Sequence, residues 1–515
     1  MKLRQVCLML GLGTALAAHG QSVRVRGGQL AGTTTAGVVS YKGVPYAAPP
    51  VGDLRWRPPV AAAPWQGVRA ATDFGPSCIQ DVARSRLPWT AEFMTQNATS
   101  EDCLSLNVWT PAKPGKQLPV YVYLHGGGFD EGSSSIAIYD GANLAKRGIV
   151  VVTINYRLGY LGQMAHPLLT AESAHHASGS YSLLDVVAAL QWVHANIAAF
   201  GGDPAQVTLG GQSAGSMMVY DLATSPLAKG LFVRAILESG SGSIAAIHMQ
   251  TLAEQEQAGI QFSAATHADT LAAMRALPAD ALLTSRLTAI HAPRLQPDVD
   301  GWVLPQSPRS AYAQGRQNHV AWLVGMQADE GSSAKTYGNL SSEEFQAAIR
   351  RGYGASADEF LRLYPASAAQ VAVSQIQSAR DRSVVLMHLW AQAASQHSGK
   401  VYLYYFARAL PWPEHPEYGA FHTSEVPYVM NTLDKVSHPV TDIDRKVSHA
   451  ASTYWVNFIK TGNPNSPGLE PWAAETSISS NTLRIDEQTG MKDLVDAQKM
   501  KFWTTYLQRT FPPEF

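Results

Sequence analysis

The stretch that decides the fold is VTLGGQSAGSMMVYDL, residues 207–222. Its first residues are apolar and β-prone, which predicts a buried strand, and residues 217–222 predict the start of a helix. Between them, residues 211–215 (GQSAG) are the one match to G-x-S-x-G in the chain. A strand, a sharp turn and a helix around a serine are the setting in which this pattern holds a nucleophile. The stretch therefore predicts an α/β fold that presents Ser213 at a strand end.

Further apolar runs, each followed by a glycine or a polar turn, indicate more strands of the same kind. They cover residues 119–124, 149–154, 235–237, 321–324 and 401–406. Ahead of residue 207, apolar residues at spacings of three and four predict one face of a helix: Leu183, Val187, Leu190, Val193 and Ile197. Ser182 and Asp185 have the spacing of a capping pair at its start. This alternation favours a mostly parallel central sheet with helices on both faces.

The composition is that of a globular protein. The chain has 515 residues, of which 46% are hydrophobic and 15% charged, enough for a large apolar core. Its formal net charge is -1, so it has no long-range field that would attract nucleic acid. Without repeats or a convincing linker, residues 21–515 are predicted to form one domain. Residues 245–320 are rich in helix signals, and we expect a helical insertion over the sheet.

The first twenty residues have the order of a signal peptide. Basic Lys2 and Arg4 precede a mostly apolar run over residues 6–18, and small residues follow. The run is too short to span a bilayer, and no later run of 18 apolar residues follows, so we expect no stable membrane span. A buried or frayed N-terminal helix is the alternative. Residues 1–20 are predicted to be a signal peptide, which favours secretion to a bacterial periplasm or the extracellular space.

Removal of that segment would leave Cys78 and Cys103 as the two cysteines. In an exported protein two cysteines favour one disulfide, and two buried thiols are the alternative. A bridge that closes a loop of this length contributes about 3 kcal/mol to stability when it is unstrained. The sequence therefore predicts a Cys78–Cys103 disulfide.

A glycine run, residues 125–129 (HGGGF), follows directly on a predicted strand. Consecutive glycines let backbone N–H groups approach a ligand closely, and such donors stabilise the oxyanion of acyl transfer. We assign this role to the N–H groups of Gly127, Gly128 and Ala214. A flexible turn and a phosphate-binding loop are the alternatives. Nucleotide binding is disfavoured because neither G-K-[ST] nor G-x-G-x-x-G is present.

Longer segments carry a family resemblance. Residues 200–215 (FGGDPAQVTLGGQSAG) and 101–111 (EDCLSLNVWTP) resemble the two signature segments of the type-B carboxylesterases, the family that includes the cholinesterases. Residues 155–159 (NYRLG) and 455–465 (WVNFIKTGNPN) also match that family. The resemblance runs from about Tyr41 to near the C-terminus. It implies the α/β-hydrolase fold with large loop and helical insertions.

The resemblance also implies the remaining catalytic residues. Chain order in this fold is nucleophile, acid, histidine. The family pattern places the acid at Glu330 rather than at Asp329, two neighbours that the residues alone do not separate. It places the histidine at His422. Relatives pair two cysteines around a loop near the site, and Cys78 and Cys103 match that pair.

Three further positions bear on the site. Ser239 matches a serine that supports the triad in relatives, and a strand-end turn is its alternative role. Gln212 stands where many relatives have Glu; a neutral side chain there weakens the case for a cationic choline substrate. Trp89 lies inside the presumed disulfide loop, but its spacing differs from that of the choline-binding tryptophan of cholinesterases. We therefore interpret Trp89 as a packing residue.

Together these residues predict a serine carboxylic-ester hydrolase that works through an acyl-enzyme on a small-molecule ester, with no cofactor and no metal. Ser213 is the nucleophile, His422 the general base and Glu330 the acid that orients it. A lipase acting on aggregated lipid and a non-catalytic esterase-like binding protein are the alternatives. The sequence indicates neither the acyl and alcohol groups of the ester nor the oligomeric state.

Overall fold

The structure is a computed structural model that describes residues 21–82, 85–113, 117–240, 249–283, 295–476 and 481–510. Its strands are β1 Ser22–Val25, β2 Gly28–Ala31, β3 Thr33–Thr35, β4 Val38–Pro45, β5 Val68–Ala70, β6 Ser105–Pro111, β7 Leu118–Leu124, β8 Val150–Ile154, β9 Gly202–Gln212, β10 Arg234–Glu238, β11 Ala321–Gln327, β12 Val401–Phe406, β13 Asn481–Ile485 and β14 Gly490–Asp493. Every strand that the apolar runs predict is present. Short polar strands such as β3 are missed, because they contain no apolar run.

The described strands form two sheets. A small sheet has the order β1-β2-β5, and the central sheet has the order β14-β13-β12-β11-β10-β9-β7-β8-β6-β4-β3. From β13 to β8 in that order, neighbouring strands run parallel. The strand pairs at both edges are antiparallel. The predicted mostly parallel sheet is therefore confirmed.

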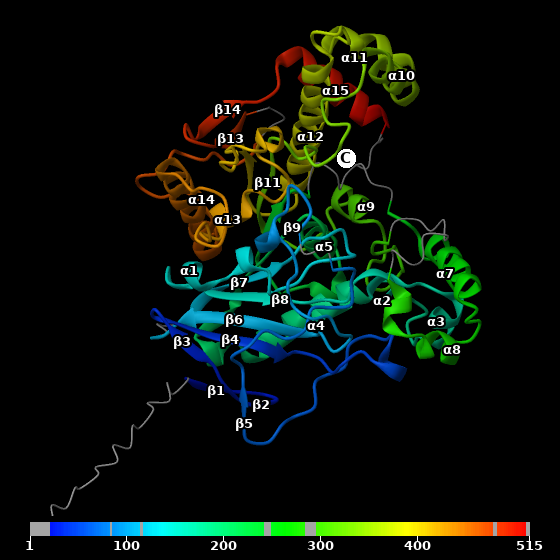
Figure 1. Cartoon of the computed structure of the whole chain (residues 1–515), viewed down its shortest axis with the longest axis vertical. Coiled ribbons are helices and arrows are strands. Elements are labelled where there is room, and N and C mark those ends of the chain that lie inside the picture. The colour runs from blue at the N-terminus through cyan, green and yellow to red at the C-terminus, as the bar shows by residue number, and fades with distance from the viewer. Residues whose placement is uncertain are drawn as a thin grey trace, which may run out of the picture.

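Helices cover both faces of this sheet (Figure 1). They are α1 Ala142–Ala145, α2 Gly159–Gln163, α3 Pro167–Glu172, α4 Tyr181–Asn196, α5 Ala214–Leu222, α7 Leu252–Thr266, α8 Leu271–Ala276, α9 Pro308–Ala313, α10 Ser342–Tyr353, α11 Ala357–Leu363, α12 Val371–Ser395, α13 Val426–Val429, α14 Asp442–Thr461 and α15 Ala497–Thr510. In Figure 1, α10, α11, α12 and α15 gather at the top, where they share an apolar cluster that the sequence does not predict.

Strand β7 shows how the two faces are filled. Val120, Val122 and Leu124 belong to an apolar cluster shared with α4 and α5. Tyr121 and Tyr123 belong to a second cluster, shared with α1 and α14. Because successive side chains of a strand point to opposite faces, the two clusters lie on opposite sides of the sheet. The carboxyl end of β7 therefore emerges between two packed layers.

The predicted helix over residues 183–197 is α4, but the predicted capping pair is wrong. Ser180 is the N-cap and makes no side-chain capping bond. Ser182 and Asp185 are both fully buried. Ser182 Oγ is hydrogen-bonded to Gln163 (2.6 Å), and Asp185 Oδ1 lies 2.7 Å from Nη2 of Arg157. Buried polar side chains need hydrogen-bond partners. Both side chains therefore bind residues elsewhere in the fold, and neither caps the helix.

One described stretch, Tyr181–Phe200, is long and apolar enough to cross a membrane by length and composition, with a mean hydropathy of 1.4. Of the 18 consecutive residues with the highest mean hydropathy in this stretch, 61% are buried inside the fold. Packing between the sheet and its neighbours therefore accounts for this composition.

Two predicted features involve residues outside the described ranges. The predicted signal peptide, residues 1–20, lies outside them entirely. The described part of the predicted insertion, residues 249–283 and 295–320, holds α7, α8 and α9. Helix α7 packs against α3 at one side of the molecule (Figure 1). That the insertion covers the sheet stays a prediction.

Candidate active site

Ser213 lies at the bend between β9 and α5. Its φ of 55° and ψ of -121° are values that a residue with a side chain rarely adopts. A Cβ at Gly211 would lie 2.6 Å from the carbonyl carbon of Gly215, and a Cβ at Gly215 would lie 2.2 Å from the carbonyl oxygen of Leu124. Only glycine fits at both positions, which is the physical reason for the G-x-S-x-G spacing.

The glycine loop, residues 125–132, follows β7 and packs directly against this bend. A Cβ at Gly126 would lie 3.0 Å from Cβ of Ser213. Within the described residues, the N–H groups of Gly127, Gly128 and Ala214 donate no hydrogen bond. Backbone N–H groups in a folded interior normally have an acceptor. These three donors are therefore available to an oxygen atom of a bound molecule.

His422 and Glu330 are brought together by two loops. Asp329 and Phe421 form a parallel β-bridge, which sets the next residue of each loop side by side. Nδ1 of His422 is hydrogen-bonded to Oε2 of Glu330. The other carboxylate oxygen accepts from the backbone N–H of Gln327 (2.9 Å). Both oxygens of Glu330 are thus held, and one of them faces the imidazole.

The second ring nitrogen of His422 faces the residue before the bend. Its Nε2 lies 3.2 Å from Nε2 of Gln212. An amide nitrogen only donates, so this contact is a hydrogen bond when the imidazole nitrogen accepts. We therefore assign the neutral tautomer with the proton on Nδ1, toward Glu330. Ser213 Oγ makes no hydrogen bond within the described part of the chain.

These groups line a cavity of about 270 Å³. Ser213, His422 and the glycine loop form one side of it. Apolar and aromatic side chains form much of the rest: Trp89, Phe93, Met94, Ile136 and Tyr139. Arg86, half-exposed, forms an ion pair with Glu131 (2.5 Å) and lies 5.2 Å from the centre of the Trp89 ring. The described residues include no group of three His, Cys, Asp or Glu side chains that could hold a metal ion.

Trp89 packs against the neighbouring apolar cluster, as interpreted, and it also contributes to the site itself. Its ring lines the cavity, and its Nε1 donates to the backbone carbonyl of His422 (3.1 Å). These partners are 333 residues apart in the chain, so local sequence carries no signal for the contact.

Ser239 also differs in detail from its expected role. Its Oγ donates to Oε1 of Gln327, and the backbone N–H of Gln327 donates to the carboxylate of Glu330. Ser239 is therefore linked to Glu330 only through Gln327.

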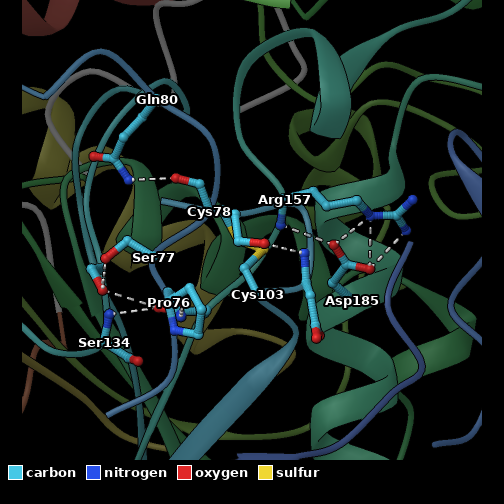
Figure 2. The surroundings of a disulfide bond; sticks show 12 residues. Pro76, Ser77, Cys78, Gln80, Cys103, Ser134, Arg157 and Asp185 are labelled. Carbon is cyan, nitrogen blue, oxygen red and sulfur yellow. Dashed lines mark hydrogen bonds and ion pairs between the residues drawn. A yellow bond between two sulfur atoms is a disulfide. The ribbon is translucent and has the colours of Figure 1, made fainter. Parts of the chain in front are cut away.

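Cys78 and Cys103 form the predicted disulfide, with an S–S distance of 2.01 Å. Figure 2 shows the bridge with Gln80 on one side and the ion pair of Arg157 with Asp185 on the other. The segment between the two cysteines supplies several residues of the cavity, including Gln80. The disulfide therefore closes the segment that forms one wall of the site.

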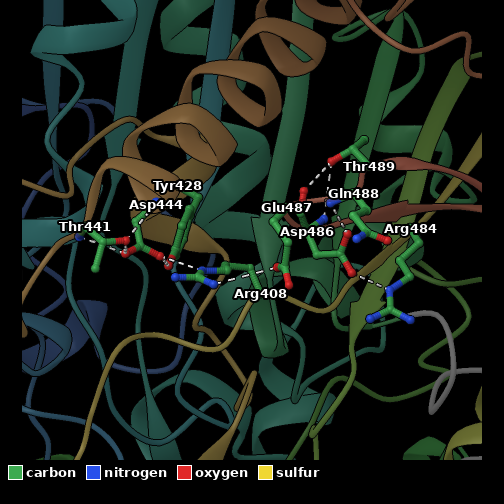
Figure 3. Close-up of polar contacts among 9 residues, drawn as sticks. All are labelled: Arg408, Tyr428, Thr441, Asp444, Arg484, Asp486, Glu487, Gln488 and Thr489. Atoms are coloured by element: carbon green, nitrogen blue, oxygen red, sulfur yellow. Dashed lines mark hydrogen bonds and ion pairs between the residues drawn. The ribbon is translucent and has the colours of Figure 1, made fainter.

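The loop that carries His422 leads into α13, which is tied to the start of α14 (Figure 3). The carboxylate of Asp444 accepts from Tyr428 Oη (2.9 Å), Arg408 Nε (2.7 Å) and the backbone N–H of Thr441 (2.8 Å). Burial alone would raise the pKa of Asp444, but these hydrogen bonds lower it below its ordinary value. The ionised carboxylate thus anchors the residues that follow His422.

Two fully buried carboxyl groups, Glu238 and Glu425, interact with each other, and Glu425 also interacts with Glu330. Glu238 accepts from Trp455 Nε1 (2.8 Å) and Tyr123 Oη (3.3 Å). Burial raises the pKa of Glu238 to about 7. Burial, followed by the charges of Glu238 and Glu330, raises the pKa of Glu425 well above its ordinary value. Neither group has a sequence signal of its own, since no motif singles out either acid.

Comparison with known proteins identifies the family of the chain. A model of the carboxylesterase family matches residues 19–503. The chain is 36% identical over 499 residues to the para-nitrobenzyl esterase of Bacillus subtilis, covering 93% of this chain and 97% of that one. It is 36% identical over 479 residues to the fumonisin B1 esterase of Sphingopyxis macrogoltabida, covering 89% and 84%. A solved structure of a PNB esterase matches with a TM-score of 0.80 and 33% identity, over 94% of this chain and 99% of that one.

The chain therefore belongs to the carboxylesterase family and has the α/β-hydrolase fold that this family shares with the solved PNB esterases. More particularly, it is a carboxylic ester hydrolase, and its substrates are small-molecule esters.

Proposed function

We propose that the chain hydrolyses esters through an acyl-enzyme formed on Ser213, with His422 and Glu330 completing a Ser-His-Glu triad. The observation that carries this proposal is the orientation of the imidazole. Nδ1 is bonded to Glu330, while the lone pair of Nε2 faces Gln212, the neighbour of Ser213. In this orientation the ring can accept a serine proton, and the carboxylate stabilises the resulting positive charge.

In the first half of the reaction, Ser213 Oγ attacks the ester carbonyl carbon and its proton passes to Nε2 of His422. The carbonyl oxygen becomes negative and accepts hydrogen bonds from the N–H groups of Gly127, Gly128 and Ala214. The bond to the alcohol oxygen then breaks, and that oxygen takes the proton from His422. In the second half, water repeats these steps, which releases the acid and restores the hydroxyl.

Gln212 holds the imidazole in place before substrate binds. Its amide donates to the same nitrogen that must accept the proton of Ser213. When an ester occupies the cavity, Ser213 Oγ replaces the amide at this nitrogen. Catalytic hydrogen bonds commonly tighten only once the substrate is bound.

The cavity supports a substrate with a small, uncharged aromatic or aliphatic group. Its volume is about 270 Å³, and aromatic side chains such as Phe93 and Tyr139 line it. The relative from Bacillus subtilis is named for para-nitrobenzyl esters. We therefore propose p-nitrobenzyl and short p-nitrophenyl esters as the first substrates to test.

The deciding experiment is Ser213→Ala with p-nitrophenyl butyrate. We expect kcat to fall by at least about 1,000-fold, since loss of a triad nucleophile removes most of the rate enhancement. Ser216→Ala is the matched control. Ser216 is a fully buried serine in α5, the helix that follows Ser213, and its hydroxyl has no partner among the described residues, so its loss should leave kcat near the wild-type value. More than a tenth of wild-type activity in Ser213→Ala, or a phosphonate adduct found by mass spectrometry on another residue, would overturn the proposal.

A further inference from the structure

Gln80 binds the far end of the glycine loop with both atoms of its side-chain amide. Its Oε1 accepts from the backbone N–H of Gly132 (2.8 Å), and its Nε2 donates to the carbonyl of Gly132 (2.8 Å). Two further bonds fix the amide itself: Nε2 donates to the carbonyl of Cys78 (3.0 Å), and Oε1 accepts from Thr95 Oγ1 (3.2 Å). Only 6% of Gln80 is exposed. One side chain thus pairs with Gly132 as a neighbouring strand would.

Gly132 is in turn packed against the start of the same loop. Its φ is 115°, and a Cβ there would lie 2.3 Å from Nδ1 of His125 and 2.4 Å from the carbonyl oxygen of Gly126. The carbonyl of Gly126 belongs to the peptide group that carries the N–H of Gly127. A shift of Gly132 would therefore remove the support behind this N–H group.

The peptide group between Gly127 and Gly128 is held by residues of the same loop. The N–H groups of Asp130 and Glu131 both donate to the carbonyl of Gly127, each at 3.0 Å. That carbonyl belongs to the peptide group that carries the N–H of Gly128. Because a peptide group is planar, fixing its oxygen fixes the direction of its N–H. The short turn over residues 130–132 thus backs both peptide groups, and Gln80 holds the end of that turn.

We propose that Gln80 is a positioning residue for the oxyanion hole. By clamping Gly132, it fixes the planes of the two peptide groups whose N–H groups meet the reacting oxygen. This inference rests on the proposed function, since it requires Gly127 and Gly128 to be the oxyanion donors. A primary amide suits the role because it offers both a donor and an acceptor, whereas leucine has a similar volume and offers neither.

The test is Gln80→Leu in the full chain, assayed with p-nitrophenyl butyrate. We expect kcat to fall by roughly 10- to 100-fold, because small displacements of catalytic donors have effects of this size. KM should stay within about twofold, since Gln80 is almost fully buried and the aromatic residues that line the cavity are unchanged. Affinity for a trifluoromethyl ketone, which adds to Ser213 and forms an oxyanion, should weaken by the same factor as kcat/KM. An unreactive ether of the same shape should bind equally well to both proteins.

Two further variants complete the experiment. Thr95→Val removes only a bond that orients Gln80, and it should cause a smaller loss of kcat in the same direction. Gln317→Leu is the control, because Gln317 is a buried glutamine bonded to Ser398 and lies before β11, at the opposite end of that strand from Glu330. It should leave kcat and the ketone affinity at the wild-type values. If Gln80→Leu does not fold, Thr95→Val decides the question.

The outcomes separate this inference from the proposed function. If the wild-type protein binds the ketone tightly and Gln80→Leu binds it equally well with unchanged kcat, Gln80 does not position the donors. An effect on KM alone would assign Gln80 to substrate contact and also overturn the inference. If the wild-type protein does not bind the ketone and Ser213→Ala remains active, the proposed function itself fails.

Discussion

Asp329 is joined twice to Ala420, two residues before His422. Its backbone N–H donates to the carbonyl of Ala420 (3.0 Å), and its carboxylate accepts from the N–H of Ala420 (2.9 Å). Of the two neighbouring acids, Asp329 thus builds the junction between the loops, and Glu330 faces the imidazole. The two carboxylates therefore have separable roles.

Exchanging each acid for its amide should separate these roles. Glu330→Gln should lower kcat by about 1,000- to 10,000-fold, since an amide neither fixes the required tautomer nor stabilises the charged ring. Asp329→Asn should keep kcat within about tenfold, because an amide oxygen can still accept from Ala420, with a lower melting temperature as its main effect. Steady-state kinetics and calorimetry of both variants check this. The larger loss of kcat in Asp329→Asn would reverse the assignment.

Gln212→Glu should change the pH dependence of the reaction. The new carboxylate would lie close to Nε2 of His422, which is now 3.2 Å from the amide, and would stabilise the protonated ring. Since the protonated ring cannot act as a base, the acid limb of kcat/KM against pH should move to higher pH. Gln488→Glu, in an exposed turn, is the control and should keep the wild-type profile. An unmoved acid limb in Gln212→Glu would show that this contact is absent in solution.

Stability should fall as the pH rises toward 7, because of Glu238. Its ordinary pKa is 4.5 and its pKa in the folded protein is about 7. Between these values the unfolded chain has released this proton while the folded chain retains it, so raising the pH favours unfolding. Glu238→Gln keeps the neutral form at every pH, and its melting temperature should fall less than that of the wild type between pH 5 and pH 8. Calorimetry at several pH values measures this.

The control for that experiment is Glu343→Gln, which changes an exposed acid and should keep the wild-type slope. An equal slope in Glu238→Gln and the wild type would mean that Glu238 is ionised in the folded protein. The sign is distinctive, because acids with a lowered pKa, such as Asp444, act in the opposite direction and stabilise the fold as the pH rises.

Asp185→Asn should be strongly destabilising. Arg157 and Asp185 are 3% and 0% exposed, and three hydrogen-bonding groups of Arg157 (the backbone N–H, Nε and Nη2) donate to this carboxylate. Removing one charge would leave the other buried and unpaired, which typically costs about 3–5 kcal/mol. Asp358→Asn, in the exposed pair with Arg350, should cost under about 1 kcal/mol. Urea unfolding compares the two, and similar costs would contradict the prediction.

The sequence predicts those features that local patterns determine. The bend at Ser213 depends on residues within two positions, and the strands depend on short apolar runs, so both could be predicted. The choice of Glu330 over Asp329 came from the family resemblance alone, because the contacts that separate them reach residues about 90 positions away. Local patterns also miss Gln80, Glu425 and the position of Trp89 in the cavity, for the same reason. Each owes its place in the site to partners that only the folded chain brings near.

The contact between Trp89 and His422 has a consequence for protein synthesis. A ribosome completes the bend at Ser213 when more than half of the chain is still missing, and His422 follows 209 residues later. Until then the serine hydroxyl lacks its proposed base, and Trp89 lacks the carbonyl of His422 as its hydrogen-bond acceptor. If Ser213 and His422 act as proposed, ester hydrolysis requires that the chain has been synthesised at least to residue 422.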